Sequence, residues 1–208
     1  MKILITDDHA VVRQGLKQIL AEGFDSIEFG EARNAQETVA QVTKTKWDLL
    51  VLDINLPDKS GLEILDELKK IRPLLPILYL SVNSEDQYAV RVVRAGAAGY
   101  LAKDSAPEEL VTAVKKVLAG GRYISPALAE KLVVGSPSSM EKQPHESLSN
   151  REFQVLRLIA SGKMPTEIAV LLKLSVPTIS TYRARLLKKM KLNSSAELMR
   201  YALQRGLV

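Results

Sequence analysis

The sequence predicts an α/β fold, a doubly wound parallel sheet of five strands, followed by a small all-α domain. Over residues 1–120, short apolar runs alternate with amphipathic stretches of helical period, the pattern of a parallel sheet covered on both faces. That period is lost over residues 121–147, where glycine, serine and proline gather. Residues 148–208 are helical in pattern throughout. We therefore expect a sheet domain, a linker and a helical domain with these bounds.

The elements of the sheet domain follow from these runs. The predicted strands lie at residues 2–6, 27–31, 48–52, 77–81 and 100–102. The predicted helices lie near residues 10–22, 35–44, 60–71, 84–95 and 106–119. Ser60 is expected to cap the third helix, while Gly96 and Gly120 are expected to end the fourth and fifth. The first and third strands are the most uniformly apolar and should lie at the centre of the sheet.

After the sheet domain, two polar stretches predict a flexible linker: Gly135-Ser136-Pro137-Ser138-Ser139 and Gln143-Pro144-His145-Glu146-Ser147. A short helix near residues 126–134 is expected to precede them. His145 is thereby interpreted as a linker residue. Four further helices are predicted at residues 150–161, 166–173, 176–190 and 195–204. Ser149 with Glu152 forms the pattern of a capping box at the start of the first of them.

The composition excludes several classes of protein. Because none of the 208 residues is cysteine, disulfides and thiolate metal sites are excluded. No apolar run approaches the roughly 20 residues that span a bilayer, and the start of the chain is too short and too acidic for a signal peptide. We therefore expect a cytoplasmic protein without a membrane partner.

The charge is unevenly distributed along the chain. Residues 1–120 hold 15 Lys and Arg against 18 Asp and Glu, whereas residues 148–208 hold 11 against 3. A mildly acidic domain joined to a small basic one suggests a controlling module attached to a nucleic-acid binder. A merely solvated basic surface is the alternative.

Three carboxylates fall where a doubly wound sheet binds its ligands. Asp7 and Asp8 follow the first strand and Asp53 follows the third, so all three reach the carboxyl edge of the sheet. Their repulsion favours a hard divalent cation, and Mg²⁺ suits one or two carboxylates with several waters. With the ion bound, one carboxylate could attack phosphorus. The alternative is a pair of helix-capping aspartates beside an unrelated surface acid.

Two further residues point to phosphoryl chemistry at the same edge. Ser81 ends the fourth strand and Lys103 follows the fifth, supplying a hydroxyl and an ammonium. Several motifs occur together in residues 1–120: Thr6-Asp7-Asp8-His9, Leu52-Asp53-Ile54-Asn55-Leu56-Pro57, Gly61, Ser81, Ala95-Gly96-Ala97-Ala98-Gly99-Tyr100 and Lys103-Asp104. In this combination, residues 1–120 resemble the receiver domain of two-component response regulators.

The resemblance implies a flavodoxin-like sheet of strand order 2-1-3-4-5 and a phospho-acceptor at Asp53, modified by a sensor histidine kinase. It implies that Mg²⁺ is held by Asp8, Asp53 and the backbone carbonyl of Asn55, with Asp7 assisting. His9 is interpreted as a loop residue rather than a ligand.

The resemblance also assigns three residues that respond to the phosphoryl group. Lys103 would pair with it, Ser81 would donate a hydrogen bond to it, and Tyr100 would reorient together with Ser81. Tyr100 equally fits a simpler role as an aromatic residue that covers the edge of the core.

The predicted helix at residues 176–190 has two contrasting faces at 100° per residue. Its apolar stripe contains Ile179, Tyr182, Leu186 and Met190, and the opposite face contains Pro177, Ser180, Thr181, Ala184 and Lys188. Small, polar and basic residues suit a helix in a DNA major groove. No acid occurs from 168 to 196, although a solvated amphipathic helix remains the alternative.

A second set of motifs occurs in residues 148–208: Leu148-Ser149-Asn150-Arg151-Glu152, Val155-Leu156, Ile159-Ala160-Ser161-Gly162, Glu167-Ile168-Ala169, Leu174-Ser175, Thr178-Ile179-Ser180-Thr181-Tyr182, Leu186, Leu187, Lys189-Met190 and Asn193. With these motifs, residues 148–208 resemble the LuxR-type helix-turn-helix domain. The DNA-contact candidates are Thr178, Ser180, Thr181, Arg183, Ala184, Arg185, Lys188 and Lys189. The family often has a basic residue at the position of Ser180 and histidine at that of Tyr182, so base contacts stay open.

Together the two resemblances describe the NarL/FixJ subfamily, in which phosphorylation controls binding to double-stranded DNA, with a homodimer expected in the phosphorylated state. We expect no enzyme activity beyond slow self-dephosphorylation. Aspartate-dependent phosphatases use an Asp-x-Asp pair after their first strand, whereas here the acids are adjacent. A dinucleotide site is excluded because no glycine-rich turn follows that strand. The closest alternative is a phosphorylation-independent DNA-binding regulator that uses its receiver only as a dimerisation surface.

Overall fold

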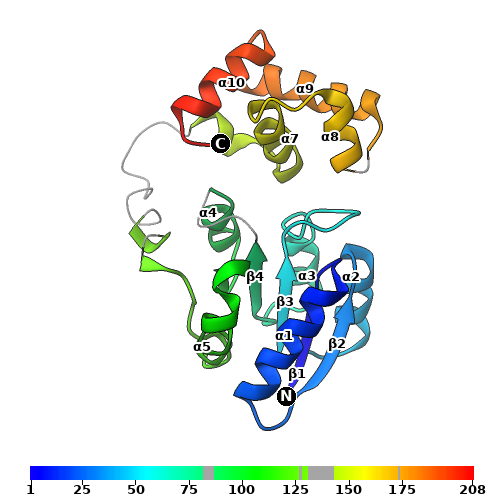
Figure 1. The fold of residues 1–208 in the computed structure, drawn as a ribbon, viewed down its shortest axis with the longest axis vertical. Coiled ribbons are helices and arrows are strands. Elements are labelled where there is room, and N and C mark those ends of the chain that lie inside the picture. The colour runs from blue at the N-terminus through cyan, green and yellow to red at the C-terminus, as the bar shows by residue number, and fades with distance from the viewer. Residues whose placement is uncertain (82–86, 127, 131–142, 173) are drawn as a thin grey trace. The chain divides into compact units, whose positions relative to one another are not determined.

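The computed structural model describes residues 1–81, 87–126, 128–130, 143–172 and 174–208. By its internal contacts the chain divides into two units, Met1–Ser136 and Pro137–Val208 (Figure 1). None of the helices in the described ranges combines the length and the apolar character that a membrane span requires.

A five-stranded parallel sheet forms the centre of the first unit. Its strands are β1 (Lys2–Thr6), β2 (Glu28–Ala32), β3 (Leu49–Asp53), β4 (Ile77–Ser81) and β5 (Gly99–Ala102). They lie in the order β2-β1-β3-β4-β5, which confirms the predicted fold class and strand order. Every residue of the central strand β3 is buried, because helices cover both faces of a parallel sheet.

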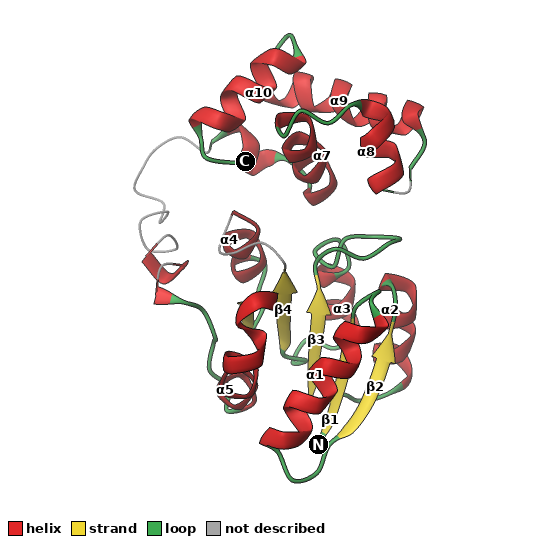
Figure 2. Cartoon of the chain, viewed as in Figure 1, coloured by secondary structure: helices red, strands yellow, loops and turns green. Residues whose placement is uncertain are grey.

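The helices of this unit lie on both faces of the sheet (Figure 2). They are α1 (Ala10–Gly23), α2 (Ala35–Lys44), α3 (Leu65–Ile71), α4 (Gln87–Arg94), the 3₁₀ turn η1 (Lys103–Ser105) and α5 (Ala106–Leu118). On one face, Leu16 and Leu20 of α1 share a hydrophobic core with Leu110 and Val114 of α5. Full burial of each such side chain contributes about 2 kcal/mol to folding. The remaining helices, α2, α3 and α4, cover the opposite face.

The third helix begins five residues later than predicted. Instead of capping α3, the Ser60 hydroxyl donates to the carbonyl of Ile54 (3.2 Å) and accepts from the N–H of Leu62 (3.3 Å). Gly61 lies so close to the Asp53 carbonyl that an added Cβ would approach its oxygen to 2.4 Å. The prediction that Ser60 caps the helix is wrong, because the hydroxyl folds the loop back onto the end of β3.

Beyond α5, the chain returns to the edge of the sheet. Tyr123 forms a parallel bridge to Gly99, donates its N–H to Ala98 and accepts the N–H of Tyr100, each hydrogen bond being 3.0 Å long. Tyr123 lies within the predicted linker, and it therefore packs as part of the sheet unit.

Some predicted segments lie outside the described residues. Of the short helix predicted near residues 126–134, the described residues 126 and 128–130 are helical, and the others fall outside. The first residues of the fourth predicted helix, 84–86, also lie outside, as does residue 173 at the end of the predicted helix 166–173.

The second unit is built of helices. They are the 3₁₀ turn η2 (Pro144–Ser147), α7 (Asn150–Ala160), α8 (Pro165–Leu171), α9 (Val176–Met190) and α10 (Ser195–Gln204). The predicted bounds of α9 and α10 agree with these. The core of the unit consists mainly of Phe153, Val155, Leu156, Ile168, Ile179, Leu186, Leu198 and Ala202.

The expected capping box at the start of α7 is confirmed. The N–H of Ser149 donates to the Glu152 carboxylate (2.8 Å), and the N–H of Glu152 donates to the Ser149 hydroxyl (3.3 Å). Two N–H groups at the open end of the helix are thereby satisfied.

The interpretation of His145 as a linker residue is wrong. Its side chain is buried, with Nδ1 2.7 Å from the hydroxyl of Tyr201 on α10 and the ring 6.3 Å from that of Phe153. Polar composition alone predicted a linker at this point, but the aromatic ring packs into the helical unit. The ordered structure of that unit therefore begins before residue 148.

Candidate functional site

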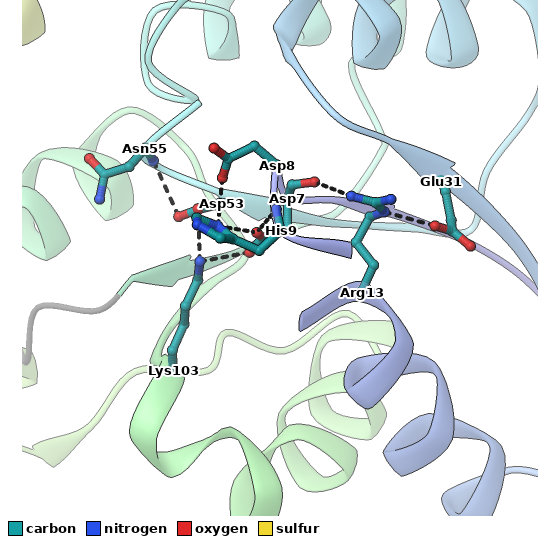
Figure 3. A network of polar contacts seen from close by, with 8 residues as sticks. All are labelled: Asp7, Asp8, His9, Arg13, Glu31, Asp53, Asn55 and Lys103. Carbon is teal, nitrogen blue, oxygen red and sulfur yellow. Dashed lines mark hydrogen bonds and ion pairs between the residues drawn. The ribbon is translucent and has the colours of Figure 1, made fainter. Parts of the chain in front are cut away.

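The carboxyl ends of β1, β3 and β5 bring three charged side chains together (Figure 3). Asp7 follows β1, Asp53 is the last residue of β3 and Lys103 follows β5. The Lys103 ammonium lies 2.6 Å from Asp7 Oδ2 and 2.8 Å from Asp53 Oδ2. Residues that are 46 and 50 positions apart in the chain meet because parallel strands end at one edge of the sheet.

The electrostatics of this pocket are dominated by burial. Asp7 is 1% exposed and Asp53 is 2% exposed. Burial raises the pKa of Asp53 above its usual range, and the nearby Asp7 carboxylate raises the pKa further. The Lys103 ammonium lowers the pKa of Asp53, but by less than burial raises it. Burial lowers the pKa of Lys103, but the carboxylates of Asp53 and Asp7 more than offset this and raise it. Two buried carboxylates share one ammonium, so the pocket favours an added cation.

Asp8 and His9 lie at the open side of the pocket. The Asp8 side chain is 30% exposed, and its Oδ1 lies 2.8 Å from His9 Nδ1. The ligand atoms of Asp7, Asp8 and His9 lie within 4.8 Å of one another, close enough to share a metal ion. Carboxylate oxygens are the ligands that Mg²⁺ prefers, and the receiver domain family typically binds this ion. The acids present therefore fit Mg²⁺.

The loop after β3 holds Asn55, whose N–H donates to Asp53 Oδ1 (3.2 Å). The same loop is fastened to α2 by Asp58, which accepts the N–H groups of Ala35 (2.9 Å) and Gln36 (3.0 Å). Burial raises the pKa of Asp58, but these backbone donors outweigh it and hold the pKa below the usual range. The loop that carries the Asn55 carbonyl is thus anchored at a second point.

Ser81 and Tyr100 lie on neighbouring strands at the same end of the sheet. Ser81 ends β4 opposite Ala102, the residue before Lys103, and is buried. Tyr100 on β5 is 3% exposed, so its ring is covered in this conformation. Both positions are compatible with a response to a group attached to Asp53.

The sequence-based prediction missed Arg13, a buried arginine on α1. Its guanidinium donates to the backbone carbonyl of Asp7 (2.8 Å) and to the carboxylate of Glu31 on β2 (2.7 Å). A signal was present, since Arg13 precedes Leu16 and Leu20 at helical spacing on the buried stripe of α1. A charged residue at such a position needs a buried partner.

In the second unit, the exposed face of α9 agrees with the helical wheel. Ile179, Leu186 and Met190 are buried. The residues that are exposed on this helix include Ser180, Thr181, Arg183, Ala184, Arg185, Lys188 and Lys189, while Thr178 is half-buried. A contiguous exposed face without acids suits a polyanionic groove.

Two of the residues predicted to contact DNA also bind neighbouring helices of the same unit. The Lys189 ammonium lies 2.7 Å from the buried carboxylate of Glu152 at the start of α7. Arg183 donates through Nε to the Ser195 hydroxyl (2.7 Å) at the start of α10. Both side chains hold α9 against neighbouring helices, a role that the helical wheel does not reveal.

Arg151, in the motif at the start of α7, also holds helices of this unit together. This buried side chain donates to the carbonyl of Leu172 after α8 (3.0 Å) and to Gln154 (2.8 Å). Arg151 therefore ties α8 to α7, while its neighbour Glu152 ties α9 to α7. The Arg-Glu pair sets the packing of α8 and α9, the two elements of the helix-turn-helix.

Two families match this chain. Residues 3–115 match the response regulator receiver domain, and residues 146–202 match the bacterial regulatory proteins of the luxR family. The matched ranges contain the acidic pocket and the α8–α9 pair, respectively.

Similar proteins cover both units together. The response regulator GacA of Pseudomonas aeruginosa is 35% identical over 100% of this chain and 98% of its own length. The response regulator UvrY of Escherichia coli is 33% identical over 100% of this chain and 95% of its own length. The structure of RcsB from Salmonella enterica serovar Typhimurium, bound to promoter DNA with a phosphomimetic, matches 97% of each chain at 27% identity and a TM-score of 0.65. By its two matched domains and its full-length relatives, the chain belongs to the NarL/FixJ family of response regulators, two-component transcription regulators with a receiver and a LuxR-type DNA-binding domain.

Proposed function

We propose that this response regulator is switched by phosphorylation of Asp53 by a sensor histidine kinase. The observation that carries the proposal is the position of the Asp53 carboxylate, buried at the end of β3 and 2.8 Å from the Lys103 ammonium. A carboxylate next to a fixed cation can attack phosphorus and then share that cation with the transferred group.

The residues of the pocket would hold Mg²⁺ through Asp8, Asp53 and the backbone carbonyl of Asn55, with Asp7 assisting. When bound, the ion offsets negative charge on the transferring oxygens. Asp8 is the most exposed of the three acids, with 30% of its side chain accessible, so it would meet an entering ion first. By accepting N–H groups at the start of α2, Asp58 would keep the loop that carries Asn55 in place.

In the transfer step, an oxygen of Asp53 attacks the phosphorus of a phosphohistidine. The O–P bond forms, the N–P bond breaks, and the electron pair returns to the imidazole nitrogen, which takes up a proton. Lys103 and the N–H of Asn55 fix the orientation of the carboxylate before the attack. Afterwards, Lys103 would pair with the phosphoryl oxygens and retain Asp7. The acyl phosphate would hydrolyse only slowly without a partner protein.

The phosphoryl group adds acceptor oxygens near the end of β4. Ser81 would donate to one of them, and Tyr100 would move with Ser81, shifting the population of receiver conformations. The phosphorylated protein would form a homodimer that presents two copies of α9 to two half-sites on DNA. The structure of RcsB bound to a promoter in the presence of a phosphomimetic supports the part of the proposal that links a phosphoryl group to DNA binding, since that relative shares both domains.

On α9, we propose that Thr178, Ser180, Thr181 and Ala184 face the bases. Arg185 and Lys188 would meet phosphates, which contributes affinity and salt dependence rather than sequence choice. Arg183 and Lys189 would contact phosphates only at the rim of the interface, because both also hold α9 in place.

The test is a gel shift on promoter DNA with Mg²⁺, with and without beryllium fluoride as phosphoryl mimic. Wild type should bind more tightly with the mimic, whereas Asp53→Asn should not respond. Asp25→Asn, at an exposed acid, is the matched control and should respond like wild type. Equal binding by wild type in both conditions would instead support the phosphorylation-independent regulator.

A further inference from the structure

Arg13 connects the pocket to the neighbouring strand. Its side chain is 8% exposed, and its guanidinium donates through Nη1 to the carbonyl oxygen of Asp7 (2.8 Å) and through Nε to Glu31 (2.7 Å). Glu31 also meets the ammonium of Lys17 at 2.5 Å. Figure 3 shows the resulting chain of contacts from Glu31 through Arg13 to the acidic loop.

We propose that Arg13 is a positioning residue for the metal and phosphoryl site, acting through the peptide that joins Asp7 to Asp8. This inference rests on the proposed function of the pocket. The Asp7 carbonyl belongs to that planar peptide, so holding its oxygen restrains the plane and with it the position of the Asp8 Cα, from which the side chain extends. On the other side of the same residue, the Asp7 N–H donates to the carbonyl of Ala32 on β2 (3.2 Å).

The chemistry of position 13 favours this role over simple packing. Arg13 shares the buried stripe of α1 with Leu16 and Leu20, where an aliphatic residue would fill the same space. Burying a guanidinium there is costly unless it is paired and hydrogen-bonded. Both of its partners are supplied: a backbone acceptor in the acidic loop and a carboxylate whose pKa is lowered by hydrogen bonds from Arg13 and Lys17. A guanidinium can bind both at once because its donors are arranged as a rigid fork.

The geometry also explains why lysine would be a poor substitute. An ammonium is a single point on a flexible stem, so it could reach Glu31 or the Asp7 carbonyl, but it lacks the fork that holds both. Removing an outer partner of a metal ligand typically weakens metal binding about 10- to 100-fold, because the ligand loses its orientation. The same loss of orientation should slow phosphorylation of Asp53.

The experiment measures Mg²⁺ affinity by calorimetry, phosphorylation by acetyl phosphate, and thermal unfolding, on the full-length protein. Arg13→Met should weaken Mg²⁺ binding by about tenfold, and Arg13→Lys should recover only part of the loss. Lys17→Met is the matched control, since it removes the other partner of Glu31 but leaves the bond to Asp7. It should bind Mg²⁺ as wild type does, even if its melting temperature falls.

Should Arg13→Met be too unstable to measure, Glu31→Gln replaces it. This variant removes the anchoring charge but keeps Arg13, and it should weaken Mg²⁺ binding relative to wild type, by less than about tenfold. Wild-type Mg²⁺ affinity in Arg13→Met, or in Glu31→Gln where that replaces it, would overturn the inference while leaving the proposed function intact. No Mg²⁺ binding and no phosphorylation in wild type would overturn the proposed function itself.

Discussion

The two units of this protein use charged side chains in opposite ways. In the sheet unit, the buried carboxylates of Asp7 and Asp53 contact the half-buried ammonium of Lys103, so each charge depends on its neighbours. On α9 of the helical unit, Arg185 and Lys188 are exposed and face solvent. The comparison teaches that a substitution in the pocket should change stability and chemistry together, whereas a substitution of Arg185 or Lys188 on α9 should change binding alone.

The largest expected effect is that of Asp53→Asn, which should abolish phosphorylation by acetyl phosphate, measured by radiolabel or intact mass. In metal-free buffer the same variant should unfold at a higher temperature than wild type. Burial raises the folded-state pKa of Asp53, so its ionised form disfavours folding. That penalty is absent below the unfolded pKa of about 3.9 and complete above the folded pKa. The stability gap should therefore widen as pH rises from 4 to neutrality.

Lys103→Ala should have the next largest effect, on stability rather than on chemistry alone. It leaves two buried carboxylates without their ammonium, and loss of one partner of a buried pair costs about 3 kcal/mol. Urea unfolding of metal-free protein measures this change in the free energy of unfolding. Millimolar Mg²⁺ should restore much of the loss, and an unchanged midpoint in metal-free buffer would contradict the account of the pocket.

Adjacent lysines on α9 sharpen the comparison within the helical unit. Lys188→Ala should weaken binding to all DNA sequences and lower the salt slope of the binding constant by about 1, with no change in melting temperature. Lys189→Ala should lower the melting temperature, because Glu152 loses the ammonium 2.7 Å away. Fluorescence anisotropy across a salt series, together with thermal unfolding, separates the two. If the two variants behave identically, the assignment of Lys188 to DNA binding and of Lys189 to the stability of the unit is wrong.

The smallest expected effect is that of Asp58→Ala, which removes the carboxylate that accepts two N–H groups at the start of α2. By analogy with helix caps, the free energy of unfolding should fall by about 1 kcal/mol. The folded-state pKa of Asp58 is lowered, so its contribution is present above the unfolded pKa and lost as the pH falls below 3.8. Chemical denaturation at pH 7 and at pH 3 tests this, with Asp58→Asn expected to recover part of the loss at neutral pH.

The sequence by itself determined the alternation of strands and helices and the place of the pocket. Short continuous apolar runs and stripes of period 3.6 are local signals, and parallel strands end at a common edge of the sheet. The sequence therefore predicted that Asp7, Asp53 and Lys103 lie close together, because each stands at the end of a strand of the same sheet. The faces of α9 were predictable for the same reason, since the angle between residues on a helix is fixed.

Only the tertiary structure decided which polar groups bind each other across elements. Arg13 meets Glu31 and the Asp7 carbonyl, Asp58 meets the start of α2, and Lys189 meets Glu152. Ser60 turned out to fold a loop rather than cap α3, and His145 packs against α10 although its neighbours in sequence are polar. Such contacts depend on distances between segments far apart in the chain, and no local period encodes them. They hold the loops and helices that carry the predicted site in place.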